Sequence, residues 1–126
     1  MNNDVPQHVR PYVEAIGTRA AVEFLLSFGG TIAYLSMRPT KDCDIVQAIG
    51  EPATIQLARE IGRGHIRIPI ANRWLARQLY AQGWSRRRIA VRLRVKIDTV
   101  RDFLRGAEMD ADQPDPRALQ LDLFRK

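Results

Sequence analysis

Residues 83–104 read GWSRRRIAVRLRVKIDTVRDFL, and this stretch decides how the C-terminal half of the chain folds. Ser85 stands where the N-cap of a helix is expected, and Ala90 is small where two helices could cross closely. The apolar residues recur at the spacing of buried helix faces: Ile89, Leu93 and Val95 first, then Val100 with Phe103 or Leu104. The stretch therefore predicts two short helices that are joined by a turn over residues 94–96.

This pattern resembles a helix-turn-helix, which leaves one face of its second helix free to enter a major groove. Two positions depart from the usual motif. Arg94 stands at the turn position usually taken by glycine, and Lys96 stands where a capping serine or threonine is usual. We expect either a left-handed Arg94, at some energetic cost, or a longer turn. We also expect Asp98 to supply the missing cap from further inside the helix.

Positive charge is concentrated around this motif. Residues 63–105 contain twelve of the twenty Lys and Arg residues and only two acids, Asp98 and Asp102, so this segment carries a charge of +10 (12 − 2). The rest of the chain carries −4 (8 − 12), which gives the net charge of +6. Such a patch attracts a polyanion before any specific contact forms. Three successive arginines at a helix start would also repel one another and the helix dipole unless a phosphate lay there. We therefore expect a double-stranded DNA interface, rather than a basic hairpin that only solvates its charges.

The two helices are expected to share the work of binding. The arginines of the first helix suit phosphates, and the mixed-charge second helix suits base edges, with Arg101 the best candidate for guanine. Its two acids would penalise indiscriminate contact with phosphates. RNA is less expected, because the chain has no aromatic sheet motif for stacking bases. The predicted DNA-binding residues are Arg73, Arg77, Arg86, Arg87, Arg88, Arg92, Arg94, Lys96, Ile97, Asp98, Thr99, Arg101, Asp102 and Arg105.

The N-terminal half predicts further helices and little strand. A single amphipathic helix is expected over Val9–Phe28, ended by Gly29-Gly30, with a short strand over 31–37. Short helices are expected over 42–49 and 52–61, extended chain over 65–68, and a helix over 70–82. We expect no internal repeat. The fold class is mainly α with a short β-strand, divided into an N-terminal dimerisation region (1–66), a helix-turn-helix domain (67–106) and a flexible acidic tail (107–126).

The chain resembles the Mor family of phage middle-transcription activators, which is related to the phage C activators. The resemblance is carried by Ile16-Gly17, by FLLSFGG at 24–30, by Tyr34-Leu35, and by the stretch from Leu75-Ala76-Arg77 to Leu104. It implies a dimer with intertwined N-terminal helices and strands, two DNA-binding modules that read an inverted repeat, and contacts that recruit RNA polymerase. The segment 39–67 is longer than the family leads us to expect.

Two interpretations of the first helix stay open. It can be an ordinary core helix, or it can pack against a partner chain. A homodimer is the preferred expectation, because a single short strand cannot satisfy its own backbone hydrogen bonds.

A pentapeptide near the C-terminus has its own pattern. The residues Gln120, Leu121, Asp122, Leu123 and Phe124 follow an acidic, proline-bearing segment. The sequence QLDLF resembles the peptide by which many bacterial replication and repair proteins bind the DNA polymerase sliding clamp. In such peptides the Leu123 and Phe124 positions fill an apolar cleft and the Gln120 position anchors a polar pocket. The alternative is a terminal turn that packs on the protein's own core.

The rest of the sequence favours no enzyme, metal site or cofactor. Cys43 stands between Asp42 and Asp44 without a third ligand, and no arrangement of nucleophile and base is visible. The start of the chain does not resemble a signal peptide, and no apolar stretch approaches the roughly 20 residues that span a bilayer. We expect a bacterial, cytoplasmic, nucleoid-associated transcription regulator of phage or phage-derived origin. The alternatives are a replication-associated adaptor that binds the clamp, and an accessory module of a recombinase or packaging machine.

Overall fold

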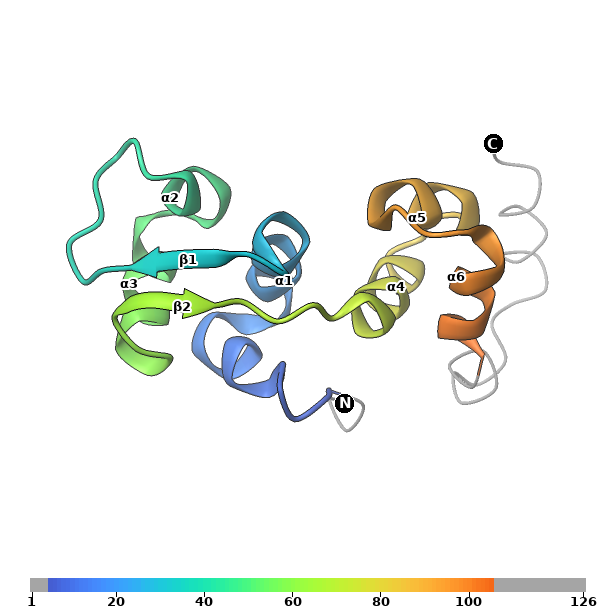
Figure 1. Ribbon diagram of the computed structural model, residues 1–126, viewed down its shortest axis with the longest axis horizontal. Coiled ribbons are helices and arrows are strands. Elements are labelled where there is room, and N and C mark those ends of the chain that lie inside the picture. The colour runs from blue at the N-terminus through green and yellow to red at the C-terminus, as the bar shows by residue number, and fades with distance from the viewer. Residues whose placement is uncertain (1–4, 106–126) are drawn as a thin grey trace. The chain divides into compact units, whose positions relative to one another are not determined.

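The computed structural model describes residues 5–105, and the chain divides into two compact units between Ala71 and Asn72 (Figure 1). The expected class is confirmed: the protein is mainly helical with short strands. The N-terminal unit contains α1 (Arg10–Phe28), β1 (Ile32–Leu35), α2 (Asp44–Ile49), α3 (Glu51–Glu60) and β2 (Gly64–Arg67). The second unit contains α4 (Asn72–Ala81), α5 (Arg86–Leu93) and α6 (Ile97–Leu104). The segment expected as a tail, 107–126, lies outside the described residues.

The helix α1 is broken at Gly17, so the expectation of one continuous helix over Val9–Phe28 is wrong. Gly17 has φ 87° and ψ 162°, a backbone conformation that only glycine adopts readily. A Cβ at this position would meet no atom of the described residues within 4 Å. The break therefore reflects backbone conformation rather than crowding, and the chain changes direction there.

The strand β1 has a partner within its own chain. It pairs with β2 in antiparallel register, with Ala33 opposite Ile66. Beyond the strands, the Ile68 amide donates to the Thr31 carbonyl and the Gly30 amide donates to the Ile68 carbonyl, each at 2.8 Å. The expectation of a lone strand is wrong, and with it the reason for requiring a partner chain; the homodimer itself stays a prediction. The same bonds hold Ile68 in the N-terminal unit, which explains why the units divide after Ala71 rather than after residue 66.

The N-terminal unit repeats one plan twice, contrary to our expectation of no repeat. Gly50 has φ 92° and ψ 160°, nearly the conformation of Gly17. Each glycine ends one helical segment and begins another, and a strand follows each pair of helices (Figure 1). Several residues recur identically at a constant offset of 33 positions (50 − 17): Val13 and Val46, Ala15 and Ala48, Ile16 and Ile49, Gly17 and Gly50, Ala20 and Ala53, Gly29 and Gly62. The repeat is weak in the sequence, because most other positions differ, including the charged ones.

The core of this unit is built mainly from α1, α3 and the inner face of the sheet. The Tyr12 and Phe24 rings lie 5.9 Å apart between centroids, and Phe24 and Phe28 lie 5.4 Å apart. Leu57 of α3 and Leu35 of β1 are fully buried. A short sheet of this size is marginal alone, so the helices that cover its inner face are what stabilise it.

We predict that Gly17→Ala and Gly50→Ala each destabilise the protein by about 1–3 kcal/mol, because alanine must adopt a strained backbone conformation at both positions. Chemical denaturation followed by circular dichroism measures the loss. Ser27→Ala, at an exposed position of α1, is the control and should change stability by less than about 0.5 kcal/mol. If Gly17→Ala is as stable as the unmodified protein, the break in α1 is not required.

Candidate nucleic-acid interface

The three helices of the second unit form one small core. Helix α6 packs against both α4 and α5. The buried side chains are Trp74, Leu75, Ala76 and Leu79 of α4, Ile89 and Ala90 of α5, and Val100 and Leu104 of α6. Of the two residues left open by the sequence, Leu104 is fully buried and Phe103 is half-buried. Ala90 is buried in this core, and its place at a close crossing of the two helices stays a prediction.

The turn between α5 and α6 is short and strained at one residue. Arg94 has φ 63° and ψ 44°, so the left-handed conformation expected there is confirmed. It is the only residue other than glycine with a positive φ in residues 5–105. The Val95 amide donates to the Ala90 carbonyl at 3.0 Å, which closes the end of α5. A side chain in this conformation costs about 1–2 kcal/mol, and the surrounding helix contacts must offset that cost.

The two helices begin in different ways. At α5 the Ser85 hydroxyl accepts a hydrogen bond from the Arg88 amide at 3.1 Å, which confirms the predicted N-cap. At α6 the cap position is Lys96, whose ammonium group has no lone pair with which to accept. The expectation that Asp98 replaces this cap is wrong. Its carboxylate accepts instead from the Arg101 guanidinium at 3.2 Å, on the outer face of the helix.

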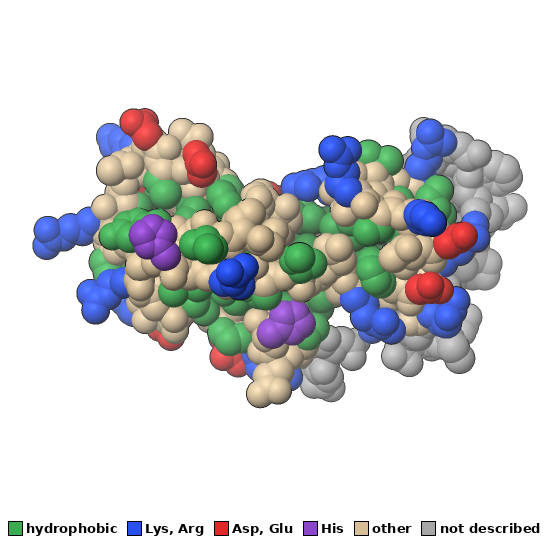
Figure 2. Space-filling model, in the orientation of Figure 1, with side chains coloured by type: hydrophobic (Ala, Val, Ile, Leu, Met, Phe, Trp, Pro, Cys, Tyr) green, Lys and Arg blue, Asp and Glu red, His purple; other side chains and the backbone are tan. Residues whose placement is uncertain are grey.

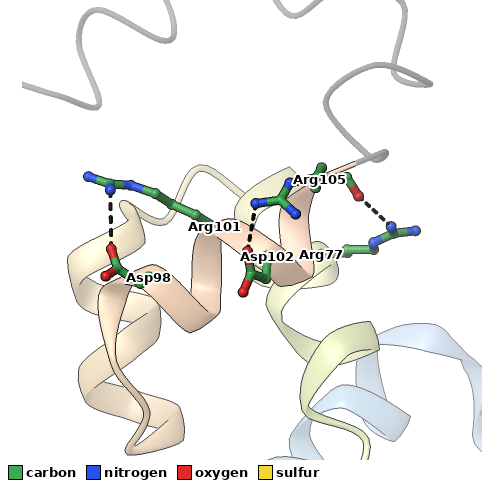
Figure 3. A network of polar contacts seen from close by, with 5 residues as sticks. All are labelled: Arg77, Asp98, Arg101, Asp102 and Arg105. Carbon is green, nitrogen blue, oxygen red and sulfur yellow. Dashed lines mark hydrogen bonds and ion pairs between the residues drawn. The ribbon is translucent and has the colours of Figure 1, made fainter.

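The outer face of α6 carries alternating charges in one stripe. Asp98, Arg101, Asp102 and Arg105 follow the i, i+3, i+4, i+7 spacing of a single helix face, and all four are exposed. Arg101 pairs with Asp98 at 3.2 Å, and Arg105 pairs with Asp102 at 2.7 Å (Figure 3). Exposed pairs of this kind contribute only about 0–1 kcal/mol each. They can therefore open at little cost when a ligand offers these arginines better partners.

Arg77 reaches from α4 to the end of α6. Its Nε donates to the Phe103 carbonyl at 2.9 Å. Its Nη2 donates to the Arg105 carbonyl, also at 2.9 Å (Figure 3). These carbonyls lie at the helix C-terminus, where a cation is favourable. Arg77 therefore fixes the angle of α6 in the unit, and its donors are directed to the protein's own backbone.

Two of the arginines at the start of α5 have their guanidinium groups over aromatic rings. The Arg88 guanidinium lies over the Trp84 ring, 3.8 Å from its centroid, and the Arg86 guanidinium lies 5.5 Å from the centroid of the Tyr80 ring. Each contact contributes about 0.5–1 kcal/mol at an exposed site. An open hollow of about 530 Å³ is lined by Gly83, Trp84, Ser85, Arg87, Arg88, Val91 and Arg92. The sequence did not predict these contacts with Trp84 and Tyr80, because helix periodicity does not show which ring lies beneath which arginine.

The other predicted residues fall into two groups. Arg73, Arg87, Arg92, Arg94, Lys96 and Ile97 are exposed, and Thr99 is half-buried. Figure 2 shows Lys and Arg side chains gathered around the part formed by α4–α6, with few acidic side chains among them. The pentapeptide 120–124 lies outside the described residues.

No protein-family model, curated protein or solved structure matches the chain. Within residues 5–105, no helix is both long and apolar enough to cross a membrane. The same range holds no cluster of three His, Cys, Asp or Glu side chains placed to bind a metal ion.

We predict that Arg77→Met lowers the free energy of unfolding by about 1–3 kcal/mol, because two carbonyls at the end of α6 lose a charged donor. Arg73→Met is the matched control: it removes the same charge from an exposed position of the same helix and should cost less than about 0.5 kcal/mol. Thermal or urea denaturation of both variants measures the difference. Equal stability of the two would show that the contact of Arg77 with α6 contributes nothing.

Proposed function

We propose that the protein is a sequence-specific, double-stranded DNA-binding transcription regulator, with α6 as the helix that enters the major groove. The observation that carries this proposal is the charged stripe of α6, built from Asp98, Arg101, Asp102 and Arg105. A helix presented by a tight turn and supported from behind by a second helix has the geometry that groove insertion requires. The stripe offers both donors and acceptors to base edges, as sequence-specific reading needs.

The arrangement of the remaining charges supports the same function. Arg87 and Arg88 lie in the first turn of α5 and Arg92 lies near its end, and all three suit the phosphates that flank a groove. Stacking of Arg88 on Trp84 occupies the face of the guanidinium and leaves its edge directed outward. Arg77 is removed from this set, since its role is to hold α6.

The acids on α6 argue for selectivity rather than for general adhesion. In the free protein, Asp98 and Asp102 hold the guanidinium groups of Arg101 and Arg105. A phosphate that approached these arginines would also meet the carboxylates, and like charges repel. A guanine edge meets no such penalty and can replace the carboxylate as the partner of Arg101. The pairing therefore favours base contacts over random phosphate contacts.

The proposal extends to a regulator of phage or phage-derived origin that acts in the bacterial cytoplasm at the nucleoid, with RNA polymerase as a partner in activation. This part rests on the resemblance to the Mor family around residues 24–30 and 75–104. Mapping the bound DNA across a genome tests it, since a regulator should be found at promoters and a packaging module at phage ends.

We predict that Arg101→Ala weakens binding to a selected DNA site by about 1–3 kcal/mol, roughly 5–150-fold, and changes binding to random duplex much less. Arg87→Ala, which removes the same charge from α5, is the control. It should weaken both DNAs alike and reduce the slope of log K against log salt by about 1. Fluorescence anisotropy over a range of salt concentrations measures both. If Arg101→Ala weakens both DNAs equally, Arg101 does not read bases.

A second candidate function is supported by one sequence feature, the peptide QLDLF at 120–124. We propose it as a contact with the DNA polymerase sliding clamp, which would make the protein a replication-associated adaptor. The acidic segment before it, with Pro114 and Pro116, has the composition of an interdomain tether.

We predict that purified sliding clamp binds the full-length protein, and that Leu123→Ala/Phe124→Ala reduces this affinity at least about tenfold, because two apolar side chains leave their cleft. Leu119→Ala, just outside the pentapeptide, is the control and should bind as the unmodified protein does. Isothermal titration or surface plasmon resonance measures the affinities. The clamp hypothesis fails if the double variant binds as well as the control.

A further inference from the structure

The two repeats of the N-terminal unit pair with each other in a register that symmetry would require. Each residue of one repeat has an equivalent 33 positions away in the other, as Gly17 has in Gly50. When each residue of the pair Ile32–Arg67 is replaced by its equivalent, the result is the pair His65–Tyr34, which the sheet also contains. The central pair, Ala33 and Ile66, is exchanged into itself. One step further along, Leu35 and Gly64 become Ile68 and Thr31, which the 2.8 Å bond from the Ile68 amide joins. The two strands are thus related by an approximate two-fold axis between Ala33 and Ile66.

The buried positions of the two repeats also correspond. At the same offset, Tyr12 matches Ile45, Phe24 matches Leu57, and Leu35 matches Ile68, and all six are buried. The second helical segment of α1 is equivalent to α3, and α1 and α3 pack against each other. Such mutual packing of equivalent elements is what a two-fold symmetric dimer shows between its subunits. Here both partners belong to one chain.

The symmetry ends where the chain has different tasks. After Leu35 the chain continues into the second repeat, whereas after Arg67 it continues to Ala71 and α4. One complete two-fold unit therefore carries a single helix-turn-helix. On the exposed face of the sheet the equivalents are unlike: Ile32 matches His65, and Tyr34 matches Arg67. The outer surface no longer presents two identical halves to a symmetric ligand.

We infer that the N-terminal unit is a duplicated module that pairs with itself, so that the protein acts as a monomer and occupies a single, non-palindromic DNA site. The backbone groups that one repeat alone would offer to a second copy are satisfied by the other repeat. An intertwined dimer that exchanged these strands between two copies would have to break that pairing first. The statement about DNA rests on the proposed function; the statement about self-pairing does not.

The oligomeric state without DNA tests self-pairing. Light scattering coupled to gel filtration, from about 1 to 100 µM, should give the mass of one chain, 14.4 kDa, throughout. A mass of two chains would overturn the inference, including a dimer formed through the exposed Ile32 and Tyr34 face, where these side chains are 57% and 60% exposed.

A cross-link tests which chain supplies each strand. Ile32→Cys/Arg67→Cys in a Cys43→Ser background places two thiols at directly opposed positions. Opposed Cα atoms in antiparallel strands lie about 4.5–5.5 Å apart, within the range of a disulfide. Oxidation should give a band of one chain's mass with altered mobility on a non-reducing denaturing gel, and Ile32→Cys/Cys43→Ser alone should not shift. A band of two chains' mass from the double variant would show strand exchange and overturn the inference.

A DNA-binding experiment tests the statement about the single site, with a duplex that carries a selected site. Titration should saturate at one chain per duplex, and footprinting should protect one recognition element. Protection of two inverted elements one helical turn apart, about 34–36 Å, would overturn the single-site statement. A protein that bound no DNA but passed the scattering and cross-linking tests would refute the proposed function while leaving self-pairing intact.

Discussion

The backbone pairing of β1 with β2 is the interaction on which the N-terminal unit depends. Two strands of four residues bury little surface and are marginal by themselves. Their pairing nevertheless brings the ends of two helical segments together, so that α1 and α3 can cover one face. The bonds that continue from Ile68 to Thr31 and Gly30 also determine where this unit ends and where α4 begins. Without the ladder, the helices would lose the partner that aligns them.

The second unit depends on a different constraint, the placement of α6. Three features determine the placement of α6: the core around Val100 and Leu104, the left-handed backbone of Arg94, and the two hydrogen bonds from Arg77. Arg94 occupies the turn and keeps its side chain exposed, whereas the Arg77 guanidinium donates to two backbone carbonyls at the end of α6. Positive charge in this segment is therefore not all available to a ligand. The exposed charge includes Arg87, Arg88 and Arg92 on α5 and a charge-balanced stripe on α6.

Charge balance on α6 connects the structure to the proposed function. A helix that carried only arginines would bind any duplex, because phosphate contacts carry no sequence information. Pairing Arg101 and Arg105 with Asp98 and Asp102 lowers that general attraction while keeping donors on the exposed face of α6. The N-terminal unit bears on the number of α6 helices in the protein rather than on their charge. If it is complete within one chain, the protein carries one copy of α6 instead of two, and the specificity of the proposed DNA binding must come from a single site.

Local patterns determined much of this protein from the sequence alone. Apolar spacing predicted α5 and α6, Ser85 predicted the N-cap, and the missing glycine left either a left-handed Arg94 or a longer turn, because each depends on residues within one or two turns of chain. The pairing of β1 with β2 and the contact of Arg77 with Phe103 and Arg105 were decided only by the tertiary structure. Each joins residues far apart in the sequence, and no local preference records which distant backbone group will accept a hydrogen bond. The outer face of α6 shows both sides of this division: helical spacing placed its charges in one stripe, but only the folded unit showed that Arg77 holds that stripe in place from behind.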